Sequence, residues 1–362
     1  AHSGSALVPW AVARNPAGTA HKFGMRLGCN STNSRDLGLC LRGKDFKEII
    51  MAQAQFMDWF MDPFVPFPPT VEVLTTTTGF VQPQGITFLP EHPYTMIKQG
   101  RFQRVPMLTG VNKDEGLLFH AETILMNEKA LGELNTEFNK WIPISLMYED
   151  ILPHVGQRDH VSQQIKSFYF GNKMIGADTR ENLTNMYSDR FFVHGVQTAA
   201  FNFAKYASVY PFLVTYTGAN SNLKLFGIGE VKGVAHSDDL QYFFEMPNMA
   251  INPGTRCEIF SKKVIKIWAS FAYYGKPTDT WISSMEWLPV QPVETVGGVP
   301  THYYELNVEP RPIESPFTNR MHFWNHLIDT ELHEELIFIP YRNNKTAFGG
   351  MPHPPFSPYR QF

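Results

Sequence analysis

A strand-like run that leads through several glycines to one histidine constrains this chain most. Residues 210–217 (YPFLVTYT) alternate in character and stop at a glycine, a pattern that predicts a β-strand. A glycine-rich loop then reaches segment 233–240 (GVAHSDDL), where we expect Asp238 or Asp239 to cap a helix. His236 is therefore predicted at an exposed loop tip, where proton transfer to a substrate is feasible. Taken alone, such a histidine more often makes a structural hydrogen bond.

A second apolar run, residues 105–109 (VPMLT), predicts a short buried strand that ends at Gly110. The chain continues as VNKDEG to residue 116, which places Asp114 and Glu115 in a polar loop. A carboxylate at the end of a buried strand can accept the Nδ1–H of a histidine, fix its tautomer and stabilise the imidazolium. Without a partner histidine, the same residues would simply form a solvated turn.

Segments 110–116 (GVNKDEG) and 233–240 together resemble the acid and histidine motifs of type-B carboxylesterases, the cholinesterase-like branch of the α/β-hydrolases. The HSDDL form is similar to that of arthropod esterases. Further matching pieces are HSGS at 2–5, MYSDR at 186–190 and RMHFW at 320–324, so the resemblance runs from the first residue to about Trp324. It implies an α/β protein with the α/β-hydrolase fold.

The resemblance also implies roles for individual residues. Glu115 would be the acid and His236 the base, with Ser3 forming a hydrogen bond beside the acid. Asp114 is expected to point away from the histidine. His120 is the main competitor for the base, but it lies too near Glu115, on the same helix start, and lacks a small-residue turn.

The nucleophile of this family is the serine of a Gly-x-Ser-x-Gly turn, and that motif does not occur in these 362 residues. The nearest look-alike, HSGSA at 2–6, has no glycine two positions before either serine. By the resemblance, the nucleophile strand and the oxyanion loop lie upstream of Ala1. We therefore expect this chain to be a C-terminal fragment of an esterase that is inactive on its own.

Two of the three cysteines, Cys29 and Cys40, bracket a polar loop. A metal site would need more ligands at short spacing, and only His21 is near, so a disulfide closing a small loop is favoured. The resembled family has a disulfide at the matching place and needs neither a metal nor an organic cofactor. Cys257 is left over as a buried or unpaired thiol.

Three sequons begin at Asn30, Asn182 and Asn344, and each is a possible N-glycosylation site. Such tripeptides also arise by chance, but together with the paired cysteines they favour an extracellular or secretory location.

Composition excludes several classes of partner. The net charge of −3 and the lack of a basic stripe argue against nucleic acid or an anionic membrane as a partner. No run of residues approaches the length of a transmembrane helix. A hydrophobic content of 43% is that of a globular chain. We expect one hydrolase domain over residues 1–340 and a flexible tail, rich in proline, glycine and aromatics, over residues 341–362.

The function predicted from these residues is hydrolysis of small-molecule carboxylic esters through a serine acyl-enzyme. The alternatives are a catalytically silent, neuroligin-like adhesion protein and a ligand-binding protein of the same fold. Retention of both Glu115 and His236 favours the enzyme, because an adhesion role needs neither side chain. The sequence does not determine which ester is cleaved, nor the oligomeric state.

Overall fold

The computed structural model describes residues 1–72, 87–152, 154–229, 231–278, 287–290, 295–296, 299–300 and 302–332. The expected tail over residues 341–362 and the sequon at Asn344 lie outside the described residues. None of the described helices combines the length and apolar character that crossing a membrane requires.

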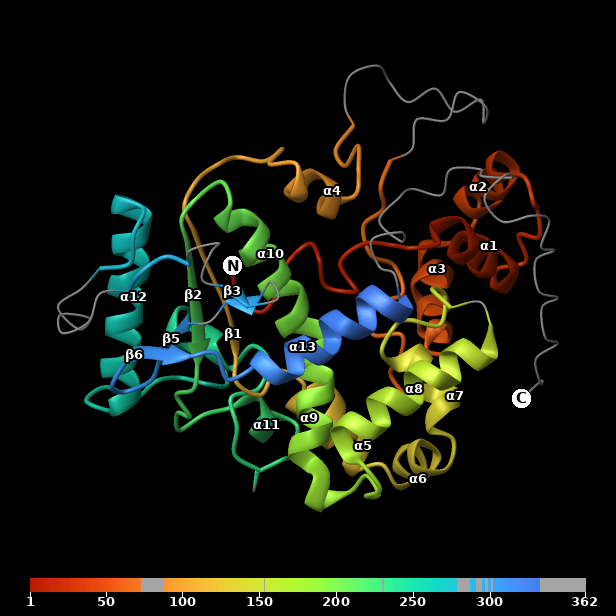
Figure 1. Cartoon of the computed structure of the whole chain (residues 1–362). Helices are drawn as coiled ribbons and strands as arrows, with labels where there is room; N and C mark the ends of the chain where they lie inside the picture. The colour runs from red at the N-terminus through yellow and green to blue at the C-terminus, as the bar shows by residue number, and fades with distance from the viewer. Residues whose placement is uncertain are drawn as a thin grey trace.

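A four-stranded sheet carries the part of the molecule that concerns function (Figure 1). Its order is β1-β2-β5-β6, and the strands span Met107–Asn112, Val209–Val214, His302–Leu306 and Arg311–Glu314. β1 pairs in parallel with β2, β2 in parallel with β5, and β5 antiparallel with β6. A separate pair, β3 (Thr295–Val296) and β4 (Val299–Pro300), is antiparallel.

Both predicted strands are present with shifted bounds. β1 begins at Met107 rather than residue 105, because Pro106 has no N–H to give to a ladder, whereas Met107 N donates to Ser208 O at 2.8 Å. β2 ends at Val214, although Thr215 N still donates to Leu306 O at 3.1 Å. Between residues 281 and 306 the structure describes β3, β4 and β5.

β2 is buried on both faces, as expected of a strand inside a parallel sheet. Tyr210, Phe212 and Val214 pack into one core with helix α12 (Arg256–Tyr274), while Leu213 packs into a second core on the opposite face. Figure 1 shows α12 on one side of the sheet and α10 (His194–Ala204) and α13 (Thr318–Leu327) on the other. This layered arrangement confirms the expected α/β class.

Helices fill most of the chain between β1 and β2. Their bounds are η2 (Leu117–Glu122), α5 (Thr123–Leu125), α6 (Glu128–Thr136), α7 (Phe138–Ser145), α8 (Val155–Phe170), η3 (Ala177–Thr179), α9 (Arg180–Ser188), η4 (Asp189–Val193) and α10. Segments η2 and η4 are π-helical turns. Helix α10 is therefore preceded directly by the π turn η4.

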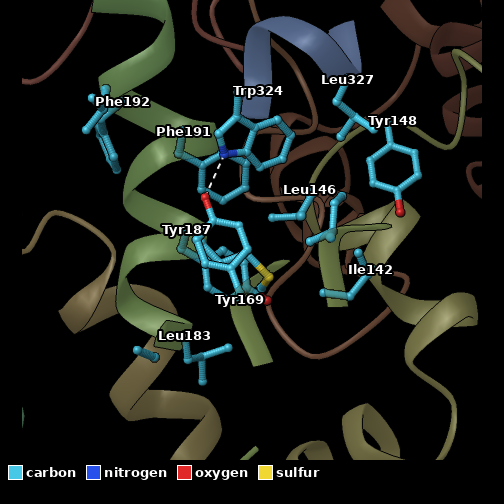
Figure 2. Packing of buried hydrophobic residues seen from close by; sticks show 14 of the residues in the cluster. Ile142, Leu146, Tyr148, Tyr169, Leu183, Tyr187, Phe191, Phe192, Trp324 and Leu327 are labelled. Atoms are coloured by element: carbon cyan, nitrogen blue, oxygen red, sulfur yellow. Dashed lines mark hydrogen bonds between the residues drawn. The ribbon is translucent and has the colours of Figure 1, made fainter. Parts of the chain in front are cut away.

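The larger core lies among these helices and α13 (Figure 2). Trp324 of α13 is fully buried, and its indole Nε1–H donates to the Tyr169 hydroxyl of α8 at 2.7 Å. A π turn, η8 (Ile328–Leu332), continues α13.

The N-terminal part holds α1 (Pro16–Arg26), α2 (Ser34–Arg42), α3 (Phe46–Gln53), η1 (Ala54–Phe56) and α4 (Pro93–Lys98). Cys29 and Cys40 form the predicted disulfide, with an S–S distance of 1.98 Å. Two further short segments, α11 (Asn222–Leu225) and η5 (Asp238–Tyr242), flank the loop that carries His236.

Candidate active site

The acid turn follows β1 directly. After Asn112 the chain turns through Lys113 and Asp114, and the Glu115 side chain is completely buried. A Cβ at Gly116 would lie 2.6 Å from Thr184 O and from Tyr187 Cβ, so this position requires glycine. Because this turn packs closely against α9, the carboxylate of Glu115 lies in the protein interior.

The base loop follows β2 and returns to the acid turn. Asp114 N donates to Val234 O at 3.0 Å, and Val234 N donates to Asp114 Oδ2 at 2.9 Å. Ser237 has a φ of 68°, in the left-handed region that non-glycine residues rarely adopt. This reversal immediately after His236 sets the direction of the imidazole.

The expectation that Asp238 or Asp239 caps a helix is wrong. The segment is the 3₁₀ turn η5, its N-cap Ser237 makes no side-chain capping bond, and both carboxylates have other donors. Asp238 accepts from Ala235 N at 3.0 Å and from Asn222 N at 2.6 Å, while Asp239 faces His2 at 2.6 Å. These hydrogen bonds tie the two carboxylates to residues that lie outside η5.

His236 and Glu115 lie in direct contact. His236 Nδ1 lies 2.8 Å from Glu115 Oε2, and an ionised carboxylate only accepts, so Nδ1 carries the hydrogen. Glu115 Oε1 accepts from Ser3 Oγ and, at 2.6 Å, from Asn112 N. The His236 side chain is 25% exposed, whereas that of Glu115 is 0% exposed. Among the described residues, none forms a hydrogen bond with His236 Nε2, which leaves that nitrogen open to a substrate.

Burial and charge shift the pKa values of both groups. Burial raises the pKa of Glu115 above its ordinary value, although the hydrogen bonds from His236, Ser3 and Asn112 act in the opposite direction. Burial opposes charge on His236 as well, but the hydrogen bond and negative charge of Glu115, aided by Asp239 and Asp238, raise the pKa of the imidazole. The site therefore favours the imidazolium that forms when a base accepts a proton.

Aromatic rings from the two π turns flank the imidazole. Phe192 of η4 stacks on His236 with ring centroids 4.7 Å apart and planes at 29°. Phe119 of η2 approaches edge-on, with centroids 6.1 Å apart, and also meets the exposed ring of Phe226. π turns occur frequently at functional sites, and here each one delivers an aromatic wall.

The other candidates lie elsewhere. His120 pairs with Asp62, with 3.3 Å between Nε2 and Oδ1, and does not contact Glu115. The Asp114 side chain accepts from the backbone N–H of Val234, and among the described residues it forms no hydrogen bond with the imidazole of His236. Ser3 donates to the acid, and Ser5 Oγ donates to Gly195 O at 2.8 Å. Within the described parts of the chain, no serine hydroxyl is hydrogen-bonded to His236.

Three features of this site were not predicted from the sequence. They are the amide of Asn112, the contact between Asp239 and His2, and the stacking of Phe192 on His236. The residues of each contact lie far apart in the chain, so local periodicity carries no signal for them. The segments HSGS and MYSDR did point to the neighbourhoods of His2 and Phe192.

The remaining predicted sites are distributed over the surface and core. Asn30 is exposed beside the disulfide. Asn182 is exposed on α9, but its Nδ2 donates to Tyr169 O at 2.7 Å. Cys257 is a free, buried thiol. In the described ranges, no cluster of three or more His, Cys, Asp or Glu side chains could hold a metal ion.

Comparison with known proteins matches residues 1–324 to the model of the carboxylesterase family. Esterase E4 of Myzus persicae is 33% identical over 293 residues, which cover 80% of this chain and 50% of that protein. Venom carboxylesterase-6 of Apis mellifera is 28% identical over 296 residues, or 80% and 50% of the two chains. A carboxylic ester hydrolase of Bombus ignitus is 26% identical over 332 residues, or 89% and 55%. The chain thus spans about half the length of the curated relatives that it matches.

Proposed function

The chain belongs to the carboxylesterase family and has its α/β-hydrolase fold, and from this premise we propose that it takes part in serine-dependent hydrolysis of carboxylic esters. Its role is to supply the acid and the base. The observation that carries this proposal is the 2.8 Å contact between His236 Nδ1 and Glu115 Oε2 at an imidazole whose other nitrogen is open.

In the proposed reaction, a serine hydroxyl attacks the ester carbonyl while His236 Nε2 accepts the hydroxyl proton. The imidazolium then gives this proton to the alkoxide that leaves, which forms the free alcohol and an acyl-enzyme. A water molecule then attacks the acyl group while His236 takes a proton from it. His236 returns this proton to the serine oxygen as the acyl–serine bond breaks, which releases the carboxylic acid and the free serine. Throughout, Glu115 fixes the tautomer of His236 and stabilises its positive charge.

The serine is assigned to residues outside this sequence. The 362 residues contain no Gly-x-Ser-x-Gly turn, and the hydroxyls of Ser3 and Ser5 are directed to Glu115 and to a backbone carbonyl. We accordingly propose that these residues alone do not hydrolyse esters, while the polypeptide that also contains the nucleophile does.

The proposed substrate is an uncharged small-molecule ester. Phe192 and Phe119 flank the imidazole, and Phe226 extends the aromatic surface outward. Apolar walls favour acyl and alcohol groups without charge, because a charged group would lose its hydration there without gaining a partner.

We also propose an extracellular or secretory location. The disulfide between Cys29 and Cys40 supports this assignment, because such bonds persist in oxidising compartments. Asn30, exposed beside it, is the preferred candidate for glycosylation, because the amide of Asn182 already donates to Tyr169 O of α8.

The test compares the native polypeptide that contains these residues with residues 1–362 alone. The native polypeptide should hydrolyse p-nitrophenyl acetate and be labelled covalently by a serine-directed fluorophosphonate. Residues 1–362 should do neither. Labelling of Ser3 or Ser5 accompanied by turnover would overturn the assignment of the serine, and an inert native polypeptide would overturn the enzymatic role.

The absence of Gly-x-Ser-x-Gly from these residues also keeps a second candidate open, a catalytically silent adhesion or ligand-binding protein of the same fold. That role requires neither a buried Glu115 nor an open His236 Nε2. A native polypeptide that binds a protein partner or ligand but resists the fluorophosphonate would favour it.

A further inference from the structure

Asn112, the last residue of β1, contacts both halves of the candidate site. Its backbone N–H donates to Glu115 Oε1 at 2.6 Å. Its side-chain Nδ2 donates to Ala235 O at 2.8 Å and to Asp239 Oδ1 at 2.9 Å. Because Ala235 directly precedes His236, a single residue holds the acid and the loop that carries the base.

A second histidine anchors the far end of this arrangement. His2 Nδ1 lies 2.6 Å from Asp239 Oδ2, and Trp268 Nε1–H donates to His2 Nε2 at 2.9 Å. An indole N–H is only a donor, so Nε2 accepts and Nδ1 carries the hydrogen given to Asp239. Trp268 thus donates to His2, and His2 donates to Asp239 Oδ2. Asn112 donates to the other oxygen of the same carboxylate, Oδ1.

His2 cannot repeat the chemistry of His236, although both histidines face a carboxylate. Both of its ring nitrogens are occupied, and Phe212, Phe243 and Trp268 surround the ring with centroids 5.0, 5.1 and 5.3 Å away. His236, in contrast, has an open Nε2. The His2 pair therefore supports the loop and does not act on a substrate.

Asp239 is suited to this support because it stays ionised. Burial alone would raise its pKa, but the hydrogen bonds from the His2 ring and from the amide of Asn112 outweigh burial and lower it. Asn112 itself is buried, and its Oδ1 has no hydrogen-bond partner among the described residues.

We propose that Asn112, anchored through Asp239, His2 and Trp268, is a positioning residue that sets the distance and angle between Glu115 and His236. Its effect on turnover rests on the proposed esterase function, whereas its effect on the geometry of the pair does not. The charged groups that act on His236 are Glu115, Asp238 and Asp239, so a change at Asn112 reaches the imidazole through two of them.

The experiment uses the native polypeptide labelled with ¹⁵N-histidine. Asn112→Ala should shift or broaden the low-field Nδ1 proton of His236 and lower the pKa of its imidazole, because the contact with Glu115 loosens. It should also lower kcat by about 10²-fold, the loss typical of a small misplacement of catalytic groups, with KM nearly unchanged.

Asn135→Ala is the matched control. The Asn135 amide also joins two segments, donating to Leu131 O at 3.1 Å and to Ile175 O at 2.9 Å, but it lies outside the site. It should lower stability without changing the His236 resonance or kcat. Should Asn112→Ala prove unable to fold, His2→Phe removes the anchor alone, and His2→Gln, which keeps a donor, should restore part of the signal.

An unchanged His236 resonance and pKa in both Asn112→Ala and His2→Phe would overturn the proposal. A shifted resonance in a polypeptide without esterase activity would uphold the positioning role and refute only the proposed function.

Discussion

His236 and His120 each lie against a buried carboxylate, Glu115 and Asp62 respectively. The His236 side chain is 25% exposed, whereas that of His120 is 4% exposed. The two pairs are also built differently. Glu115 also accepts from the Ser3 hydroxyl and the Asn112 N–H, while Asp62 binds both His120 and the Ser145 hydroxyl, which in turn contacts the Tyr187 hydroxyl.

The neighbours of each ring explain the difference. His120 is stacked on Tyr187 with centroids 4.3 Å apart and planes at 20°, and Phe191 and Phe64 cover it at 4.9 and 5.3 Å. That pair ties the π turn after the acid to the loop at Asp62, and so acts as a brace. A histidine beside a carboxylate is consequently no sign of catalysis by itself; an open second nitrogen is also required.

The largest difference between the two pairs should be in turnover. In the native polypeptide, His236→Ala should lower kcat/KM by about 10⁴- to 10⁶-fold, because the base is lost. His120→Ala should change it far less, since that ring reaches no substrate. Hydrolysis of p-nitrophenyl acetate measures both, and a greater loss in His120→Ala would reverse the assignment of the base.

Glu115→Gln should lower kcat by about 10³- to 10⁴-fold while preserving the fold, because an amide no longer stabilises the imidazolium or fixes its tautomer. Asp62→Asn is the parallel change in the brace and should have a much smaller effect on kcat. Steady-state kinetics of the two variants provide the check. Equal losses would mean that both carboxylates serve the reaction.

The order of the two pairs should reverse for stability, so that a change in the Asp62–His120 pair lowers the free energy of unfolding more than a change in the Glu115–His236 pair. Asp62→Ala leaves His120 and the Ser145 hydroxyl buried without their acceptor, so the free energy of unfolding should fall by about 3–5 kcal/mol. His236→Ala leaves the buried Glu115 carboxylate with its Ser3 and Asn112 donors, so it should lower the free energy of unfolding less than Asp62→Ala does. Urea denaturation followed by tryptophan fluorescence compares them. An Asp62→Ala variant whose urea midpoint equals that of the unsubstituted protein would contradict the structural role of the Asp62–His120 pair.

The smallest predicted effect is a displaced pH profile. Only neutral His236 can accept a proton, and its pKa lies above the ordinary value of 6.5, so kcat/KM should fall as pH decreases through a value above 6.5. Glu115→Gln should move this acidic limb to lower pH in the residual activity, and His120→Gln should leave it in place. A parent limb below 6.5 would contradict the proposed environment of His236.

Part of this arrangement follows from local sequence. Alternation and glycine punctuation predict β1 and β2, and the motifs after them single out Glu115 and His236. The brace does not follow, because Asp62 and His120 meet only after two distant segments fold together. The aspartates after His236 show the limit of local rules. A short carboxylate before a turn ordinarily caps the helix that follows it. Here Asp238 instead accepts from Asn222 N at the start of α11, and Asp239 faces His2, which is remote in sequence.

The parallel pairing of β1 with β2 has a consequence for the evolution of this protein. Asn112 is in register with Val214, so the acid turn and the base loop start from one shared backbone ladder. Phe119 and Phe192, in contrast, reach the imidazole from π turns in the helical region. Substitutions in those turns would reshape the aromatic walls without moving the proton-transfer pair. Under the proposed esterase function, ester preference could therefore diverge among descendants, or in a directed-evolution library, while the proton-transfer pair is inherited intact.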